Sequence, residues 1–131
     1  MTSELLVDAI KGVTAAGNVT VTSEGGSATM QLQQGLAKVF FEGDGTLSSN
    51  HLADSLNVDS FTDTSTGAYS VTFTNNFAST GYVQAVHSNN FHTIPSSGGH
   101  ATRGFTFQTF TSGNSNGDCA YIGGTATGDL A

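Results

Sequence analysis

The sequence predicts an all-β protein: an antiparallel β-sandwich of about seven to eight strands with a short N-terminal helix or arm. Three observations lead to this class. Several short segments alternate apolar and polar residues with a period of two, as half-buried strands do. Turns rich in Gly, Ser, Thr and Asn separate these segments, as in sandwiches and small barrels. A length of 131 residues fits one domain with its own core.

We expect residues 1–35 to form an N-terminal arm with the first strand, serving attachment or contacts between copies, and residues 36–131 to form the sandwich. Residues 2–12 read TSELLVDAIKG. Ser3 could cap a short helix there, with Gly12 as its stop, although a strand remains an alternative for so short a segment.

The next segments read as strands joined by turns. Residues 18–23, NVTVTS, alternate cleanly and precede a turn with two glycines, which predicts a strand. Residues 28–34 leave extended and coiled structure both open. Residues 37–43, AKVFFEG, are β-branched and aromatic and end at an Asp-Gly turn, so they predict another strand.

Residues 55–77, SLNVDSFTDTSTGAYSVTFTNNF, predict a hairpin. Leu56 and Val58 are expected on its first strand, and the alternating residues from Tyr69 to Phe73 on its second. The turn is expected at DTSTG, residues 63–67, because Asp, Ser, Thr and Gly bond their own backbone or tolerate positive φ.

Three further strands are predicted at residues 81–88, 102–112 and 119–124. Between the first two lies NNFHTIPSSGGHA, residues 89–101, which contains the only proline of the chain. We expect this stretch to be a long loop, and loops of that length in compact domains usually carry function or move.

Charge and cysteine content exclude several classes of function. The formal net charge of −7, with only three Lys and Arg, argues against nucleic acid and against an anionic membrane surface as partners. The only cysteine, Cys119, can form neither an internal disulfide nor a cysteine metal cage, and it is expected in the core. The start MTSELLVDAI has no basic segment before an apolar core, so we expect no secretion signal there, and no apolar run approaches the roughly 20 residues of a membrane span.

No catalytic constellation is recognisable, so we expect a protein that is not an enzyme and needs no cofactor. Carboxylates that could serve acid/base chemistry stand beside turns, where Asp is favoured for backbone bonding: Glu42, Asp44, Asp59, Asp63 and Asp118. The serines form no nucleophile elbow.

His87, His92 and His100 gather in and beside the long loop, and His51 lies elsewhere. Their loose spacing is not that of a metal site, so no metal is expected within one chain. An alternative is a threefold axis at which His87, His92 or His100 from three copies would face one ion. The same loop supplies the candidate residues for contact with a receptor or partner: Asn89, Asn90, Phe91, His92 and His100. Phe91 is expected either to make that contact or to anchor the loop.

Three stretches, residues 32–46, 55–77 and 81–86, resemble a module of tail-fibre and related virion proteins of tailed bacteriophages, notably those of aquatic hosts. The resemblance covers about two-fifths of the chain well, whereas the part from His87 onward matches no pattern. Its positions are packing and turn residues, so it implies a fold and a virion context but no catalytic residue. The matching positions are Lys38, Phe40, Asn57, Val58, Thr66, Gly67, Tyr69, Val71, Phe73 and Tyr82.

The resemblance implies a protein made in the host cytoplasm and displayed on the virion surface as a tail-fibre or receptor-binding knob. A homotrimer is expected, with other tail or capsid proteins as partners and a host-surface glycan as the receptor. The alternative is a purely structural capsid decoration or cement protein, or a tail adaptor. A depolymerase or other hydrolase is disfavoured because no credible nucleophile or carboxylate pair is present.

Overall fold

The computed structural model describes residues 7–10, 12–13, 19–22, 26, 28–32, 36–47, 52–89, 91–96 and 98–131. The chain divides into two units, residues 1–36 and 37–131. In the first unit, β1 (Thr20–Thr22) pairs antiparallel with β2 (Thr29–Gln31), which confirms the strand predicted at 18–23. Most of the helix considered for residues 2–12 lies outside the described residues, and residues 7–10, 12 and 13 form neither helix nor strand.

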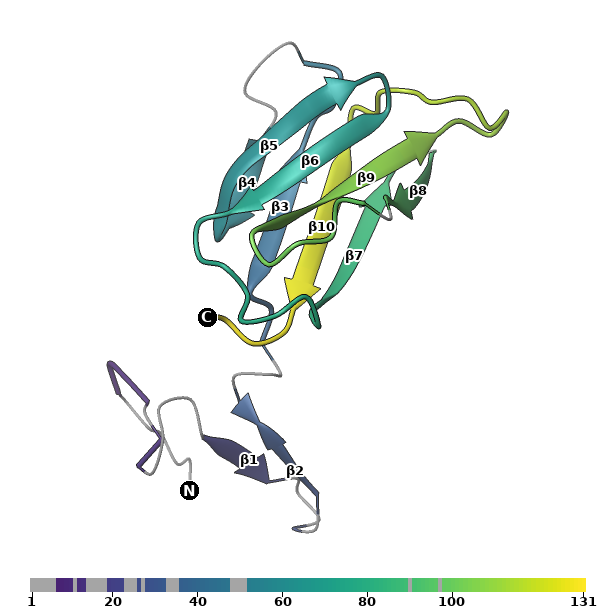
Figure 1. Ribbon diagram of the computed structural model, residues 1–131. Coiled ribbons are helices and arrows are strands. Elements are labelled where there is room, and N and C mark those ends of the chain that lie inside the picture. The colour runs from purple at the N-terminus through teal and green to yellow at the C-terminus, as the bar shows by residue number, and fades with distance from the viewer. Residues whose placement is uncertain are drawn as a thin grey trace, which may run out of the picture. The chain divides into compact units, whose positions relative to one another are not determined.

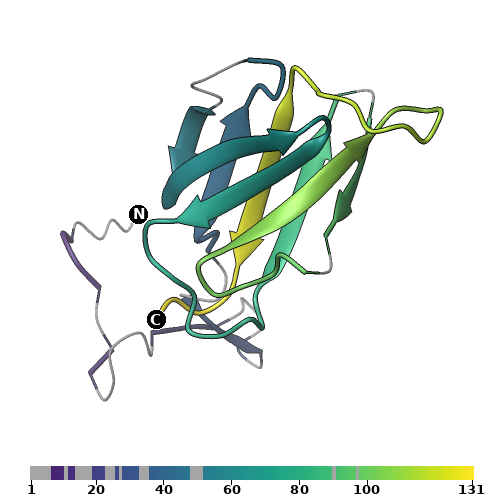
Figure 2. The same cartoon turned by 45° about the horizontal axis from the view of Figure 1, so that its top comes forward.

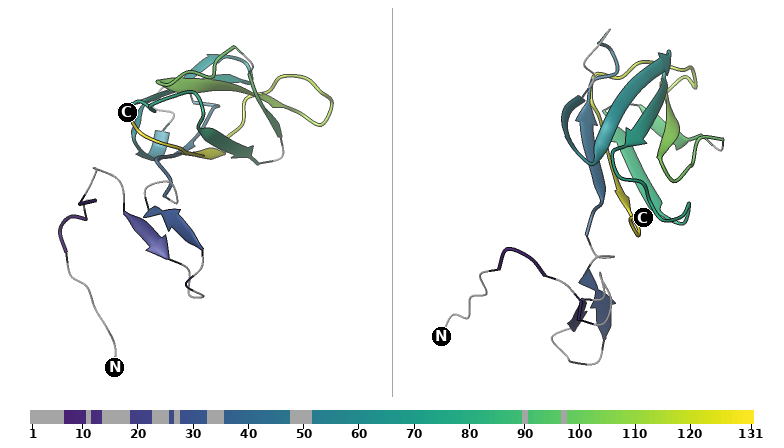
Figure 3. Two further views of the ribbon diagram at one scale, coloured as in Figure 1. Left: turned by 60° about the horizontal axis from the view of Figure 1, so that its bottom comes forward. Right: turned by 60° about the vertical axis from the view of Figure 1, so that its left-hand side comes forward.

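The second unit is the predicted antiparallel β-sandwich, with two four-stranded sheets (Figure 1). The first sheet has the order β4-β3-β10-β7 and the second has the order β5-β6-β9-β8. The strands are β3 (Val39–Gly43), β4 (Leu52–Leu56), β5 (Val58–Ser65), β6 (Ala68–Phe73), β7 (Val83–Ser88), β8 (His92–Pro95), β9 (Gly104–Phe110) and β10 (Ile122–Thr127). Figure 2 shows β5, β6 and β9 crossing in front of β3, β10 and β7. The two layers are also visible from other sides in Figure 3.

Aromatic side chains fill the space between the sheets. In β3, Val39 and Phe41 point inward and are buried, whereas Phe40 and Glu42 point outward, as the period-two alternation predicts. The ring of Tyr69 lies 5.4 Å from that of Phe61 between centroids. Burying each such side chain contributes about 1.5–3 kcal/mol. The remaining large core residues are Val71, Phe73, Phe77, Tyr82, Phe105, Phe107 and Ile122.

The hairpin predicted at 55–77 is confirmed for β5 and β6, but Leu56 and Val58 do not share a strand. Leu56 ends β4 in the first sheet and Val58 begins β5 in the second. Between them Asn57 adopts φ 59°, a left-handed conformation that Asn tolerates better than most residues. Its Oδ1 accepts a hydrogen bond from the Asn75 N–H at 2.7 Å, which fixes this corner. The turn of the hairpin is also shorter than DTSTG, because residues 63–65 belong to β5.

The stretch 89–101 is not only a loop. Residues His92–Pro95 form β8, which pairs with β9 at the edge of the second sheet. Pro95 closes this strand, and an edge position accommodates proline because no further strand needs its N–H. The long loop is therefore divided by a strand, and residues 98–103 remain as the connection from β8 to β9.

Candidate functional site

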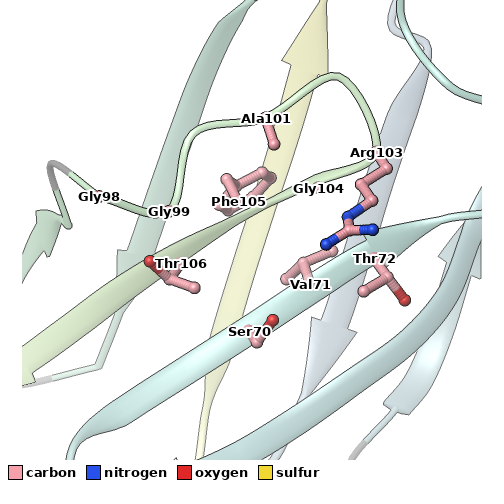
Figure 4. Close-up of a pocket in the computed structure, with 10 residues that line it drawn as sticks. All are labelled: Ser70, Val71, Thr72, Gly98, Gly99, Ala101, Arg103, Gly104, Phe105 and Thr106. Atoms are coloured by element: carbon pink, nitrogen blue, oxygen red, sulfur yellow. The ribbon is translucent and has the colours of Figure 1, made fainter.

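A hollow of about 260 Å³ lies on the outer face of the second sheet, where the chain connecting β8 to β9 passes beside β6 and β9 (Figure 4). We call it the Arg103 pocket. Its lining includes Ser70, Thr72, Gly99, Arg103, Gly104 and Thr106. Pockets for drug-sized ligands usually measure about 300–1,000 Å³, so this one suits a single ring or a comparable group.

The register of β6 and β9 places polar side chains over the floor of the Arg103 pocket. Ser70 pairs with Thr106 and Thr72 pairs with Gly104, so these residues share the outer face. Val71 and Phe105 also border the pocket, but their side chains are buried in the core. The floor is thus a hydroxyl-bearing surface on a rigid sheet.

A tight turn over residues 101–104 forms one side of the Arg103 pocket. The Ala101 N–H donates to the Gly104 carbonyl at 2.9 Å, and the Gly104 N–H donates to the Ala101 carbonyl at 3.1 Å. The buried hydroxyl of Tyr82 lies 3.0 Å from the Ala101 carbonyl and 2.9 Å from the Gly104 carbonyl, so one O–H serves both. Burial raises the pKa of Tyr82 to about 12, so this donor stays protonated at neutral pH.

Neighbouring segments also stabilise the turn over residues 101–104 through main-chain hydrogen bonds and the contacts of His100. The Phe73 N–H donates to the Arg103 carbonyl at 2.8 Å, and the Phe77 N–H donates to the Thr102 carbonyl at 2.9 Å. His100 stacks on Tyr82, and its Nε2 lies 2.9 Å from the Thr80 carbonyl. These contacts fix the main chain on both sides of Arg103, so the pocket is largely formed in advance.

Glycines make room for the Arg103 pocket. A Cβ on Gly104 would lie 3.1 Å from the Thr72 Cα and would collide with the Val71 carbonyl. A Cβ on Gly99 would collide with the Thr106 side chain, at 2.6 Å from its Cβ. Both positions therefore need glycine for the close approach of the connecting chain to the sheet.

Arg103 supplies the positive charge of the pocket. Its side chain is exposed and extends from the turn towards β6 (Figure 4). Within the described part of the chain no carboxylate pairs with its guanidinium, and the other described cation, Lys38, is buried. An anionic or strongly polar ligand in the pocket could therefore bind the accessible guanidinium of Arg103.

The predicted contact residues that the structure describes, Asn89, Phe91, His92 and His100, do not line the Arg103 pocket. Phe91 is half-buried and packs against the core, as expected of a loop anchor. Asn89 accepts a 2.7 Å hydrogen bond at Oδ1 from the buried thiol of Cys119, and its N–H donates to the Tyr121 carbonyl at 3.1 Å. His92 is exposed on β8, and Asn90 lies outside the described residues.

The three histidines that the structure describes lie apart from one another in the second unit. His87 lies on the outer face of the first sheet, where its ring is 5.7 Å from that of Tyr121. His92 is on an edge strand of the second sheet, and His100 is stacked on Tyr82. His51 lies outside the described residues. Among the residues whose positions are described, no group of three His, Cys, Asp or Glu side chains could hold a metal ion.

Two of the carboxylates considered for acid/base chemistry serve the backbone. Asp44 Oδ1 accepts hydrogen bonds from the Thr46 N–H at 2.8 Å and from its hydroxyl at 2.6 Å. Asp118 Oδ1 accepts a 2.6 Å hydrogen bond from the Gly67 N–H. Both act as the turn-stabilising residues that their sequence positions predict.

Sequence reasoning missed the Arg103 pocket because its residues come from distant segments and are of common types. Ser70, Thr72 and Thr106 look like ordinary outward-facing strand residues. One stretch could have indicated the pocket: GGHATRG, residues 98–104, in which one of only three Lys and Arg residues stands among three glycines.

No helix within the described residues is long and apolar enough to cross a membrane. Comparison of the chain with known protein families, with curated proteins and with solved structures found no match.

Proposed function

We propose that this chain is a structural protein of a tailed-bacteriophage particle, displayed on the virion surface as a tail-fibre or receptor-binding knob that binds a host-surface glycan. The Arg103 pocket carries this proposal. It is open to solvent, it is fixed by main-chain hydrogen bonds, and it presents hydroxyl groups and a guanidinium. Convergent donors and acceptors on a rigid scaffold are what a sugar needs for recognition.

The resemblance of residues 32–46, 55–77 and 81–86 to a tail-fibre module supports the virion context. Most of its positions have structural roles here. Tyr69, Val71, Phe73 and Tyr82 are buried, and Asn57 and Gly67 adopt positive φ. The resemblance therefore concerns the scaffold that carries the pocket, and the proposed role is binding rather than catalysis, without a cofactor.

We further propose that the knob acts as a homotrimer associated with other tail or capsid proteins. This assembly follows from the resemblance and would present several copies of the pocket to one cell surface, which raises avidity without new contacts. Sedimentation equilibrium should give three times the mass of the chain. A monomer at micromolar concentration would contradict the trimer.

Glycan binding can be tested with the purified protein on a panel of immobilised bacterial surface polysaccharides. Ser70→Tyr fills the Arg103 pocket from its floor and should abolish binding while circular dichroism stays unchanged. Gln108→Ala is the matched control, because Gln108 lies on the same face of β9, two residues beyond Thr106, and does not line the pocket. Equal binding by both variants would place glycan recognition elsewhere.

A second candidate function, capsid decoration or cement protein or tail adaptor, is favoured by the outer face of the first sheet. There Leu56 pairs with Phe40, Phe40 with Thr125, and Thr125 with Ala85, which makes one row across four strands. Leu56 is 47% exposed and Phe40 is 39% exposed. Exposed apolar groups that line up on one face mark a protein contact.

The neighbouring row on that face defines the chemistry of the partner. Asp54 pairs with Glu42 there, beside Leu56 and Phe40. The fitting partner is a virion subunit with an apolar surface bordered by Lys or Arg. The double variant Phe40→Ser with Leu56→Ser should no longer co-sediment with particles, whereas Ile94→Ser, which changes an exposed apolar residue of the second sheet, should do so normally. Labelling of intact particles with an antibody then decides between the tail and the capsid.

A further inference from the structure

We propose that the Arg103 pocket selects a carboxylate-bearing sugar, a uronic acid, with its carboxylate on the Arg103 guanidinium and its ring over the hydroxyls of β6 and β9. This inference rests on the proposed function, since it assigns the class of glycan that the knob would bind.

The position of Arg103 favours a directed ion pair. Its main-chain carbonyl accepts from the Phe73 N–H at 2.8 Å, and the next residue, Gly104, is held by Ala101 and by Tyr82. The side chain therefore starts from a fixed point and extends towards β6 beside Thr72 (Figure 4). A guanidinium binds a carboxylate through two parallel N–H···O bonds, a geometry that a fixed base makes easier to reach.

The charge of the protein also favours a carboxylate over a phosphate as the ligand group. The chain has a formal net charge of −7, which repels anions over most of its surface. Arg103 is exposed and makes no salt bridge with a carboxylate among the described residues. The Asp59 carboxylate also lies close to the floor, with its Oδ2 3.5 Å from the Thr72 hydroxyl. Arg103 can therefore balance at most one negative charge of a ligand, which a monoanionic carboxylate does not exceed. A dianionic phosphate would leave an unbalanced negative charge beside an acidic protein, so the carboxylate is the better fit.

The Ser70 hydroxyl is free to meet the ring of the sugar. Ser70 and Thr106 lie directly opposite each other on paired strands, and neither side chain makes a hydrogen bond to the described residues. The Thr106 hydroxyl is in contact with Gly99, where an added Cβ would collide with it, so Ser70 is the residue of this pair that we expect to bind the ring. Thr72 differs, because its hydroxyl already lies 2.6 Å from that of Ser60.

The glycines explain why a ring can enter. Gly98 and Gly99 on the rim and Gly104 beside Thr72 add no side chains of their own to the hollow. The site therefore combines an open space above the sheet with hydroxyls on its floor and a cation at its edge.

The test compares glucuronate, glucose and glucose 6-phosphate as free ligands of the whole protein, with binding followed by NMR shifts of the amides of Arg103, Gly104 and Thr106. We expect glucuronate to bind more tightly than both other sugars, and its affinity to fall as salt is added. Arg103→Gln should weaken glucuronate binding by about tenfold or more and leave glucose binding unchanged. Gln108→Ala should bind like the wild type.

The outcomes separate this inference from the proposed function. Equal binding of glucose and glucuronate, or an unchanged affinity in Arg103→Gln, would overturn the carboxylate assignment and leave a glycan-binding knob in place. Tighter binding of glucose 6-phosphate would replace the carboxylate by a phosphate and overturn it as well. If no sugar binds but the protein still blocks phage adsorption to host cells, the pocket assignment fails alone. If it neither binds sugars nor blocks adsorption, both proposals fail.

Discussion

The ring of Tyr82 stacks on the imidazole of His100, with centroids 4.2 Å apart and planes inclined by 22°. This pair joins the start of β7 to the chain that forms the rim of the Arg103 pocket. Because the Tyr82 hydroxyl also reaches the Ala101 and Gly104 carbonyls, one buried side chain determines the shape of the rim.

Tyr82→Phe keeps the ring and removes only the hydroxyl. We expect a loss of about 1–2 kcal/mol in the free energy of unfolding, because two carbonyls lose their shared donor. Urea unfolding measures this as a lower midpoint with an unchanged m-value. Tyr121→Phe is the control, since Tyr121 is 41% exposed, and it should stay within about 0.5 kcal/mol of the wild type. Equal effects of the two variants would show that the hydroxyl of Tyr82 contributes nothing specific.

Gly104→Ala tests the close approach of the turn to β6. The added methyl group would collide with the Val71 carbonyl, and main chain cannot move aside as a flexible side chain can. We expect a loss of about 1–3 kcal/mol, as for overpacking in a rigid site. Gly98→Ala is the matched control, because a Cβ at Gly98 meets nothing within 4 Å. Thermal unfolding of both variants makes the comparison, and a stable Gly104→Ala variant would mean that the turn can shift.

The sequence alone predicted the sandwich because its signals are local. The alternation in 37–43 and 69–73 follows directly from which side chains face the core, and the structure has Val39, Phe41, Tyr69, Val71 and Phe73 buried. The corner at Asn57 was missed for a physical reason. Its left-handed φ separates Leu56 from Val58 without interrupting the apolar and polar alternation of the sequence.

The Arg103 pocket could not be predicted in the same way. Its floor depends on the register of β6 with β9, which places Ser70 opposite Thr106, residues far apart in the chain. Its rim depends on Tyr82, whose hydroxyl bonds have no local sequence signature. Similarly, Phe91 could be read as a contact or an anchor until its packing against the core was known.

Asp118 connects the hairpin turn between β5 and β6 to the chain that precedes β10. Its Oδ1 accepts from the Gly67 N–H at 2.6 Å and from the Tyr69 hydroxyl at 3.3 Å. Asp118→Ala should cost about 1–3 kcal/mol, because a part-buried N–H is left without an acceptor. Asp118→Asn keeps an oxygen at the same place and should lose less. Urea midpoints rank the three proteins, and an Asn variant as unstable as the Ala variant would indicate that the negative charge matters more than the acceptor.

The two buried tyrosines predict a loss of stability at alkaline pH. Desolvation by burial raises the pKa of both Tyr69 and Tyr82 from 10.0 to about 12. Below pH 10 the folded and unfolded states both hold these protons, so neither residue makes stability depend on pH there. Between pH 10 and 12 the unfolded chain releases them while the folded protein keeps them, so stability falls as pH rises through this window and levels off above it.

Urea unfolding at a series of alkaline pH values, with tyrosinate absorbance read in parallel, measures this decline. Phenylalanine cannot ionise, so in Tyr69→Phe and in Tyr82→Phe the free energy of unfolding should fall less steeply between pH 10 and 12 than in the wild type. Each variant should nevertheless be less stable than the wild type at neutral pH. The two reductions in slope should add, because each comes from a separate phenol proton that the native state retains. A double variant that declines as steeply as the wild type would mean that other groups cause the alkaline instability and that these two phenols ionise alike in the folded and unfolded states.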